Sequence, residues 1–177
     1  MLIDTHAHLN FKAFDSDRDE VIKRTLSNDT WIINASSNYK TSLLAVKIAQ
    51  QYPAGVFASV GLHPINCVVD LSQNDEDRLE ELDTEKYIEL AKEKGVVAIG
   101  EIGLDYWNEP EGKAKAEVFK SKQKEVFLKQ LELARELDLP VILHCRKAHN
   151  DLIEILAIPP HPSAPSRGVG RKFKTGA

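Results

Sequence analysis

The sequence predicts an α/β fold in which strands alternate with helices along one chain. Short apolar runs alternate with longer amphipathic segments, the runs are rich in valine, isoleucine and leucine, and each ends beside a polar residue. Strands that are joined through helices pair in parallel, with the helices on the outside of a sheet or barrel. The length of 177 residues and the hydrophobic content of 42% fit one domain with a sizeable core.

Five strands are expected from the apolar runs. They occupy residues 2–4, 31–35, 55–60, 96–99 and 141–144. Amphipathic segments predict helices over residues 17–27, 41–51, 84–94, 117–137 and 148–156. The fourth helix is the clearest, because its apolar residues recur at largely helical spacing and Pro140 separates it from the last strand. The acidic segment 70–83 predicts a solvated loop.

The end of the chain differs in composition from the rest. Residues 157–177 contain four of the eight prolines, four basic residues and no acidic residue. This composition predicts a disordered, basic tail after a folded domain of residues 1–156. The net charge of −4 therefore divides into an acidic body, with 19 basic against 27 acidic residues, and the tail. An acidic body argues against a protein that grips a long phosphate backbone, whereas a small substrate or a polynucleotide end remains open.

Cysteine usage and hydropathy bear on the compartment. Cys67 and Cys145 are far apart and match no disulfide or zinc-ribbon spacing, which suits a reducing cytoplasm. No apolar run approaches the roughly 20 residues that span a bilayer, and the first residues lack the features of a secretory signal. We therefore expect a cytoplasmic protein without a membrane partner.

A pair of histidines follows the first expected strand. His6 and His8 are two residues apart, so in extended chain both imidazoles lie on the same face. Two neutral ring nitrogens that converge in this way are typical ligands of Zn²⁺, Mn²⁺ or a similar ion, and Asp4 or Asp15 is a candidate for fixing the rings. The alternative is a pair of polar residues that only cap a strand.

Glu101 and His144 follow or end two later strands. Glu101 lies between glycines after an apolar run, where a buried carboxylate needs a partner or a metal ion. His144 ends the fifth strand, at the end where an α/β barrel presents its catalytic groups. Each residue alone has an ordinary explanation, as a surface glutamate or a core histidine. Together with the histidine pair, they predict a metal centre built from three strand ends.

Two further residues are candidates for catalysis or substrate binding. His63 follows the third strand and is a candidate for contacting substrate or for giving a proton to a leaving group, or it is only a loop histidine bonded to backbone. Arg146 lies on the same side as His144 and suits a phosphate or carboxylate, or a surface ion pair. Cys145 points to the opposite face, so we discount it. Residues 105–107 either close the mouth of the site or pack beneath the next loop.

Four motifs taken in order closely resemble the TatD family of metal-dependent deoxyribonucleases. They are Ile-Asp-Thr-His-Ala-His-Leu at residues 3–9, Val-Gly-Leu-His-Pro at 60–64, Ile-Gly-Glu-Ile-Gly-Leu-Asp-Tyr at 99–106 and Pro-Val-Ile-Leu-His-Cys-Arg at 140–146. The resemblance covers residues 1 to about 156. It is specific because four motifs share the order and the strand ends, whereas the histidine pair alone indicates only the broader amidohydrolase-like superfamily.

The resemblance implies a TIM-type (β/α)₈ barrel with two divalent metal ions, Mg²⁺, Mn²⁺ or Zn²⁺. It implies that His6 and His8 bind one ion, that Glu101 bridges both, and that His144 belongs to the other. The implied activity is exonuclease-like hydrolysis of phosphodiester bonds in DNA ends or short strands, by a water that the two ions activate. Glu101 is then also a catalytic residue, and His63 and Arg146 contact the substrate.

The chain departs from the family pattern in length. A barrel of this kind takes about 250 residues, so we expect an incomplete barrel of about five βα units that lacks three. The family's further histidine after strand six and its aspartate after strand eight are then expected to be absent. The abrupt change of composition after residue 156 suggests the hypothesis of a frameshift or a truncated reading frame, with a genuine tail as the alternative. We expect weak or no activity from such a chain, and self-association through its open edges.

Two other functions remain open at this stage. A cyclic-amide hydrolase shares the barrel and the histidine pair, but it bridges its metals with a modified lysine, and Glu101 favours the nuclease. The second alternative is a non-catalytic fragment that binds metal or nucleic acid, with the basic tail making the contacts.

Overall fold

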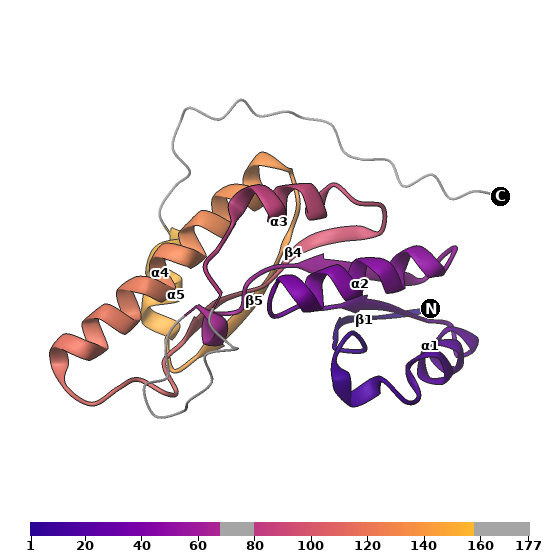
Figure 1. Cartoon of the computed structure of the whole chain (residues 1–177), viewed down its shortest axis with the longest axis horizontal. Coiled ribbons are helices and arrows are strands. Elements are labelled where there is room, and N and C mark those ends of the chain that lie inside the picture. Colours follow the sequence, from indigo (N-terminus) through magenta and orange to yellow (C-terminus); the bar gives the residue numbers. More distant parts are fainter. Residues whose placement is uncertain (68–79, 158–177) are drawn as a thin grey trace.

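The computed structural model describes residues 1–67 and 80–157. Residues 158–177 of the expected tail and residues 70–79 of the expected acidic loop lie outside the described residues. The remaining part of the chain forms one sheet with its helices (Figure 1). In that part, no helix is both long and apolar enough to cross a bilayer.

All five expected strands are present and pair in parallel, in the same order as in the sequence. They are β1 (Leu2–Ala7), β2 (Thr30–Asn34), β3 (Val56–Val60), β4 (Val96–Asp105) and β5 (Val141–Arg146). Because all four pairings are parallel, the carboxyl ends of the strands lie along one edge of the sheet. The sheet does not close: β1 and β5 each have one neighbour among the described strands. The fold is therefore an incomplete barrel of five βα units, as predicted.

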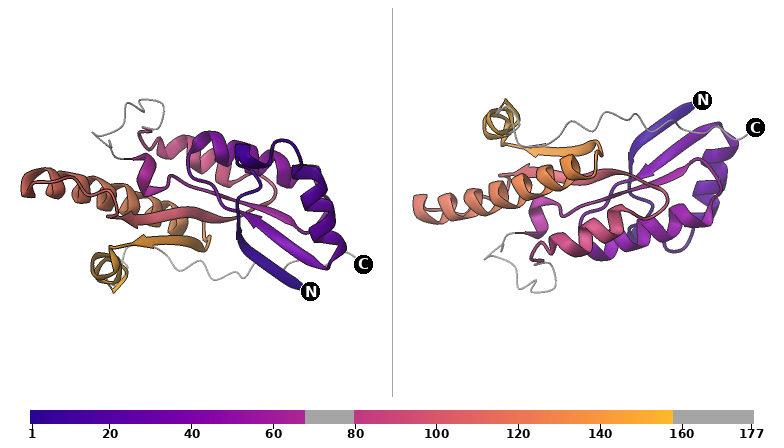
Figure 2. Two further views of the ribbon diagram at one scale, coloured as in Figure 1. Left: turned by 90° about the horizontal axis from the view of Figure 1, so that it is seen from below. Right: turned by 90° about the horizontal axis from the view of Figure 1, so that it is seen from above.

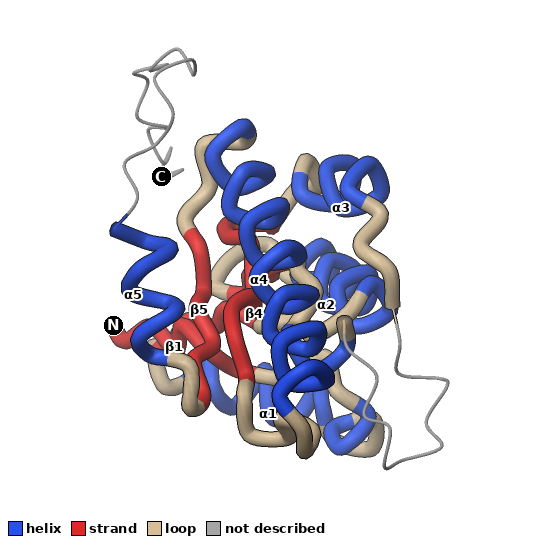
Figure 3. Tube along the Cα trace, turned by 90° about the vertical axis from the view of Figure 1, so that its left-hand side faces the viewer, coloured by secondary structure: helices blue, strands red, loops and turns tan. Residues whose placement is uncertain are grey.

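The expected helices are also present, with shifted ends. They are α1 (Arg18–Ser27), α2 (Tyr39–Gln51), α3 (Thr84–Ala91), α4 (Lys113–Glu136) and α5 (His149–Ala157). Figure 2 shows α2, α3 and α4 together on one side of the sheet, and Figure 3 shows α4 along β4 and α5 beside β5. Two single turns of 3₁₀ helix, Lys12–Phe14 and Pro64–Asn66, were not expected from the apolar pattern.

The largest hydrophobic cluster fills the space between the sheet and these helices. Buried residues of β3 and β4, such as Val60 and Ile102, face Tyr87 of α3 and Phe127 of α4. Cys145 packs against this cluster, so it lies on the helix side of β5 as predicted. Because side chains alternate along a strand, Glu101 beside Ile102 and His144 beside Cys145 lie on the opposite, inner face.

The two edge strands are more exposed than the central ones. Leu2 of β1 is 70% exposed and Leu143 of β5 is 39% exposed, whereas β3 and β4 are almost wholly buried. Ile153 on α5, the helix that follows β5, is 65% exposed. Apolar side chains at two unpaired strand edges are an unusual surface for an isolated monomer.

Three strands continue beyond their expected ends, which moves the candidate residues into the sheet. His6 lies within β1, Glu101 lies in the middle of β4, and His144 precedes the last two residues of β5. The expectation that Glu101 follows its strand is therefore wrong. The reason is the pairing of β4 with β5, which resumes after a register shift and runs on to Asp105 and Arg146.

Two buried glutamines of α4 hold the ends of β3 and β4. The Gln130 side chain accepts a hydrogen bond from the Leu62 amide (2.7 Å) and donates one to the Leu62 carbonyl (2.9 Å). Gln123, two turns earlier, makes the same pair of bonds with the Asp105 backbone, at 2.7 and 2.8 Å. Both side chains are 1% exposed, so each satisfies backbone groups that water does not reach.

We expect Gln130→Leu to destabilise the protein by about 2–4 kcal/mol, because both backbone groups of Leu62 would stay buried without a partner. Urea unfolding followed by circular dichroism measures the change. Gln50→Leu is the matched control, since Gln50 is an exposed residue that donates only to the Glu93 side chain. An equal, small effect of the two substitutions would contradict the role given to Gln130.

Candidate metal centre

Side chains from β1, β4 and β5 converge on one carboxylate. Glu101 of β4 is 7% exposed and is surrounded by His6, His8, His63 and His144. His6 comes from β1, His8 follows it directly, and His144 comes from β5. All residues that the sequence predicts as metal ligands therefore lie together.

The two oxygens of Glu101 face different histidines. Oε2 lies 3.0 Å from His6 Nε2 and 3.9 Å from His8 Nε2. Oε1 lies 2.8 Å from His144 Nδ1 and 3.8 Å from His63 Nε2. Within each of these two groups, the nitrogen and oxygen atoms lie within 4.8 Å of one another. The carboxylate is thus shared by two groups of histidine side chains.

A backbone carbonyl fixes the ring orientation of His8. His8 Nδ1 lies 3.0 Å from the Ala35 carbonyl and donates to it, which leaves Nε2 unprotonated and directed toward Glu101. Asp4 accepts from the backbone amide of His6, so it positions the residue rather than the ring. Asp15 is paired with Arg18 instead, at 2.6 Å. The ring of His8 is therefore held by a carbonyl, and neither aspartate has the expected contact with an imidazole.

Asp105 orients His144, a role that the sequence reasoning missed. Its Oδ2 lies 2.9 Å from His144 Nε2, while Oδ1 accepts from the Trp107 amide. In the metal-free chain both ring nitrogens of His144 donate to carboxylate oxygens, Nε2 to Asp105 and Nδ1 to Glu101. Because Asp105 retains the proton on Nε2, release of the Nδ1 proton would leave a lone pair free for a metal ion. Strand alternation contained the signal, because Glu101 and Asp105 are four residues apart on β4 and lie on one face.

The surrounding histidines keep Glu101 ionised. Burial disfavours the charged form, but the hydrogen bond with His144 and the attraction of His63 and His6, which are protonated in the acidic range where Glu101 titrates, outweigh it and lower the pKa of Glu101 to about 2. Burial likewise opposes protonation of His144, yet its bonds to Glu101 and Asp105 raise its pKa. The site therefore combines a permanent negative charge with imidazoles around it, which is the donor set that divalent transition metals prefer.

His63 differs from His8 in its tautomer. Its Nδ1 accepts a hydrogen bond from the Ile65 amide at 3.1 Å, so the neutral ring carries its proton on Nε2. Burial, followed by the nearby His144, lowers the pKa of His63 to about 4, and the ring is neutral at pH 7. A protonated Nε2 is a hydrogen-bond donor and not a metal ligand. The geometry favours a contact to an anionic oxygen over donation of a proton to a leaving group.

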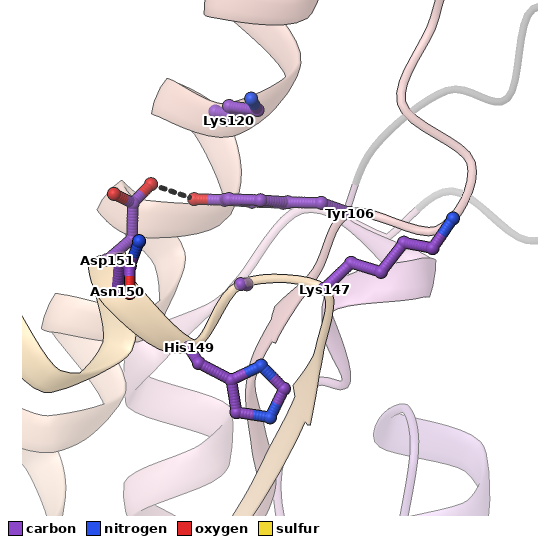
Figure 4. A pocket seen from close by; sticks show the side chains of 7 residues that line it. Tyr106, Lys120, Lys147, His149, Asn150 and Asp151 are labelled. Carbon is purple, nitrogen blue, oxygen red and sulfur yellow. Dashed lines mark hydrogen bonds between the residues drawn. The ribbon is translucent and has the colours of Figure 1, made fainter.

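Arg146 lies outside this cluster, over the ring of Trp107 at 3.9 Å from its centroid. A cavity of about 450 Å³ opens nearby, and Figure 4 shows the side chains that line it, with the Tyr106 hydroxyl donating to Asp151 (2.7 Å). None of the four clustered histidines lines this cavity. The cluster and the cavity are therefore separate features, joined through residues 105–107.

We expect Asp105→Asn to weaken metal binding by about 10–100-fold, because an amide can present its N–H to His144 and reverse the tautomer that leaves Nδ1 free. Calorimetric titration with Zn²⁺ measures the affinity. Asp83→Asn is the control, since this aspartate caps α3 and pairs with Lys86 on the surface. Equal affinity in the Asp105 variant and the wild-type chain would exclude a role for this carboxylate in holding the metal ligand.

The fold and the site define a class: an α/β protein of the TIM-barrel type with a candidate metal centre on the inner side of its strands. Comparison with protein families then places the chain, because the family model described as TatD related DNase matches residues 3–175. The chain therefore belongs to the TatD related DNase family.

Individual relatives agree with this placement. The chain is similar to the metal-dependent hydrolase YabD of Bacillus subtilis, with 38% identity over 88% of this chain and 55% of the relative. It is 31% identical to the 3'-5' ssDNA/RNA exonuclease TatD of Escherichia fergusonii, over 88% of this chain and 54% of the relative. The crystal structure of YJJV, a TatD homologue from Escherichia coli K12, superposes with a TM-score of 0.68 at 28% identity, covering 88% and 54% of the two chains. The chain thus spans about half the length of the curated relatives that it matches.

Proposed function

We propose that this chain is a metal-dependent hydrolase that cleaves phosphodiester bonds in nucleic acid. The observation that carries the proposal is the position of Glu101, whose two oxygens face separate histidine groups. A carboxylate shared in this way is suited to bridging two divalent ions. The names of its relatives support the reaction class, since one is a metal-dependent hydrolase and another an exonuclease.

The residues divide into three roles under this proposal. His6 and His8 hold one ion, His144 contributes to the other, and Glu101 serves both. Divalent ions bound there would activate water and offset the charge that develops on a phosphoryl group. His63 donates its Nε2 proton in a hydrogen bond to a phosphoryl oxygen, and its low pKa keeps the ring in the required neutral form. Arg146 supplies a positive charge for a neighbouring phosphate.

We infer that the substrate is an end of DNA or a short strand. The acidic body disfavours binding along a duplex, and one relative is named a 3'-5' exonuclease of single-stranded DNA and RNA. Two buried or half-buried free cysteines support the cytoplasm as the compartment.

Nucleotide release from a labelled single strand tests the function. With Mn²⁺ or Mg²⁺ present, we expect mononucleotides from a linear strand and none from a circular strand of the same sequence, which has no end. Release that continues after chelation of the metal would contradict the proposal. The same assay shows whether this chain has the weak activity expected from its length.

Two alternatives have their own tests. A cyclic-amide hydrolase would open a dihydropyrimidine ring, and we expect no such turnover because Glu101 occupies the place of the bridging lysine. A non-catalytic binder that uses its tail would lose salt-sensitive DNA binding when residues 157–177 are deleted. If DNA instead binds at the metal centre, as we propose, that deletion should leave DNA binding unchanged.

We also propose self-association through the open edges of the sheet. The exposed Leu2 and Leu143 on the two edge strands, and Ile153 on α5, support this. Light scattering over a range of concentrations tests it: we expect the mean mass to rise with concentration, and a constant monomer mass would contradict it.

A further inference from the structure

A half-exposed tryptophan with two cations lies just beyond the histidine cluster. Trp107 follows the end of β4 and is 52% exposed, although tryptophan side chains are usually largely buried. The guanidinium of Arg146 lies 3.9 Å from the centroid of its indole ring, and the Lys147 ammonium lies 4.2 Å from it. An accessible aromatic surface and two positive charges are thus gathered at one place.

Hydrogen bonds attach this group of residues to the metal-ligand cluster. The Trp107 amide donates to Asp105 Oδ1 at 2.9 Å, and the other oxygen of Asp105 bonds to His144. The Tyr106 amide donates to the Arg146 carbonyl at 2.8 Å, which ties the end of β4 to the end of β5. The position of Trp107 relative to His144 is therefore fixed through a single intervening side chain.

Arg146 and Lys147 differ from the neighbouring lysines in their charge partners. Lys120 is paired with Glu109 at 2.9 Å, and Lys124 is paired with Asp151 at 2.8 Å. Among residues 1–67 and 80–157, by contrast, no carboxylate lies within ion-pair distance of Arg146 or Lys147. Their positive charges are available to an anion in an otherwise acidic body.

We propose that Trp107, Arg146 and Lys147 form a binding site for single-stranded nucleic acid beside the metal centre, with a base stacked on the indole and phosphates on the two cations. Aromatic rings interleaved with basic side chains are how single strands are bound without sequence preference. Lys147 has a flexible stem, so its ammonium moves to a phosphate and exposes ring surface to the base. This inference rests on the proposed function, since it names how that site holds the strand.

The cavity beyond Lys147 gives the strand room to continue. Its volume of about 450 Å³ is in the range of small-molecule sites, and Tyr106, Lys147, His149 and Asn150 are among the residues that line it (Figure 4). The acidic residue in its wall, Asp151, is already held by the Tyr106 hydroxyl and by Lys124. A nucleotide there meets hydrogen-bond donors and little free negative charge.

Fluorescence quenching tests the site directly. The chain has two tryptophans, so in a Trp31→Phe background the emission comes from Trp107 alone. The phenyl ring retains aromatic packing against Phe57, which Trp31 contacts at a centroid distance of 5.7 Å. A short oligothymidylate is titrated in the presence of chelator, which keeps the strand intact. We expect saturable quenching, and about tenfold weaker binding of an abasic strand of equal length, since it offers phosphates without bases.

Salt dependence measured by anisotropy of a labelled strand tests the cations. We expect Lys147→Ala to reduce the slope of log affinity against log salt by about 0.7, the contribution of one phosphate contact on a single strand. Lys23→Ala, which removes an exposed lysine of α1, serves as the control and should leave the slope unchanged.

The outcomes separate this inference from the proposed function. Absent quenching, or equal affinity for the abasic and the normal strand, would overturn the stacking site even if the chain releases nucleotides. Preferential binding of a phosphopeptide or another polyanion in place of the strand would also overturn it. If quenching and the changed slope are both found while no nucleotide is released, the binding site stands and the hydrolase proposal fails.

Discussion

Replacing Glu101 by glutamine is expected to reduce hydrolysis by more than about a hundredfold and to abolish binding of at least one metal ion. The amide keeps the size of the side chain but loses the negative charge that faces both histidine groups. Substitution of a residue that only hydrogen-bonds to a metal ligand lowers metal affinity or activity by about 10–100-fold, so loss of the shared ligand itself should have a larger effect. Release of nucleotides and elemental analysis of the purified chain measure the two effects.

Glu89→Gln is the control for this substitution, because Glu89 is an exposed residue on α3. It should retain full metal content and rate. A Glu101→Gln chain that binds as much metal as the wild type would remove the basis for the proposed centre.

Gly103→Ala is expected to unfold the protein or to cost more than about 4 kcal/mol of stability, a loss outside the range of ordinary substitutions. Gly103 has a φ of +147°, and a Cβ there would overlap the carbonyl of His144 on the paired strand. Backbone in β5 cannot move aside as a flexible side chain can. The strands β4 and β5 would have to separate, and Glu101 and His144 would separate with them.

The substitution Gly112→Ala serves as a comparison, because it separates the cost of the clash with His144 from the cost of placing alanine at a positive φ. Gly112 has a φ of +95°, but a Cβ there would have open space around it. We expect its substitution to cost only about 1 kcal/mol, since strain of this kind costs about 1–3 kcal/mol. Thermal unfolding of both variants gives the comparison, and equal losses would show that the close approach of β4 and β5 is unimportant.

Much of the fold was predictable because apolar runs and helical periodicity are local signals. All five strands and five helices were found where these patterns placed them. The carboxyl end of β4 was harder to predict, because the strand extends through glycines to Asp105 only where β5 pairs with it. Val118 shows a second limit: it belongs to the apolar pattern of α4 but is 71% exposed, while the adjacent Phe119 is buried.

The candidate site was predictable in its residue types but not in its supporting contacts. The histidines and Glu101 were identified from their places near strand ends. The bonds from Gln123 and Gln130 to backbone connect residues that are far apart in sequence, up to 68 positions for Gln130 and Leu62, and no local pattern encodes such pairs. The tautomer of His63 likewise depends on the turn that begins at Pro64, which brings the Ile65 amide to its ring.

Electron paramagnetic resonance of the full chain titrated with Mn²⁺ tests the shared carboxylate most directly. If Glu101 bridges two ions between the histidine groups, the spectrum should show an exchange-coupled manganese pair in the wild-type chain and lose the coupling in Glu101→Gln. A spectrum of isolated bound ions, or of free aqueous manganese alone, would contradict a bridging role for Glu101.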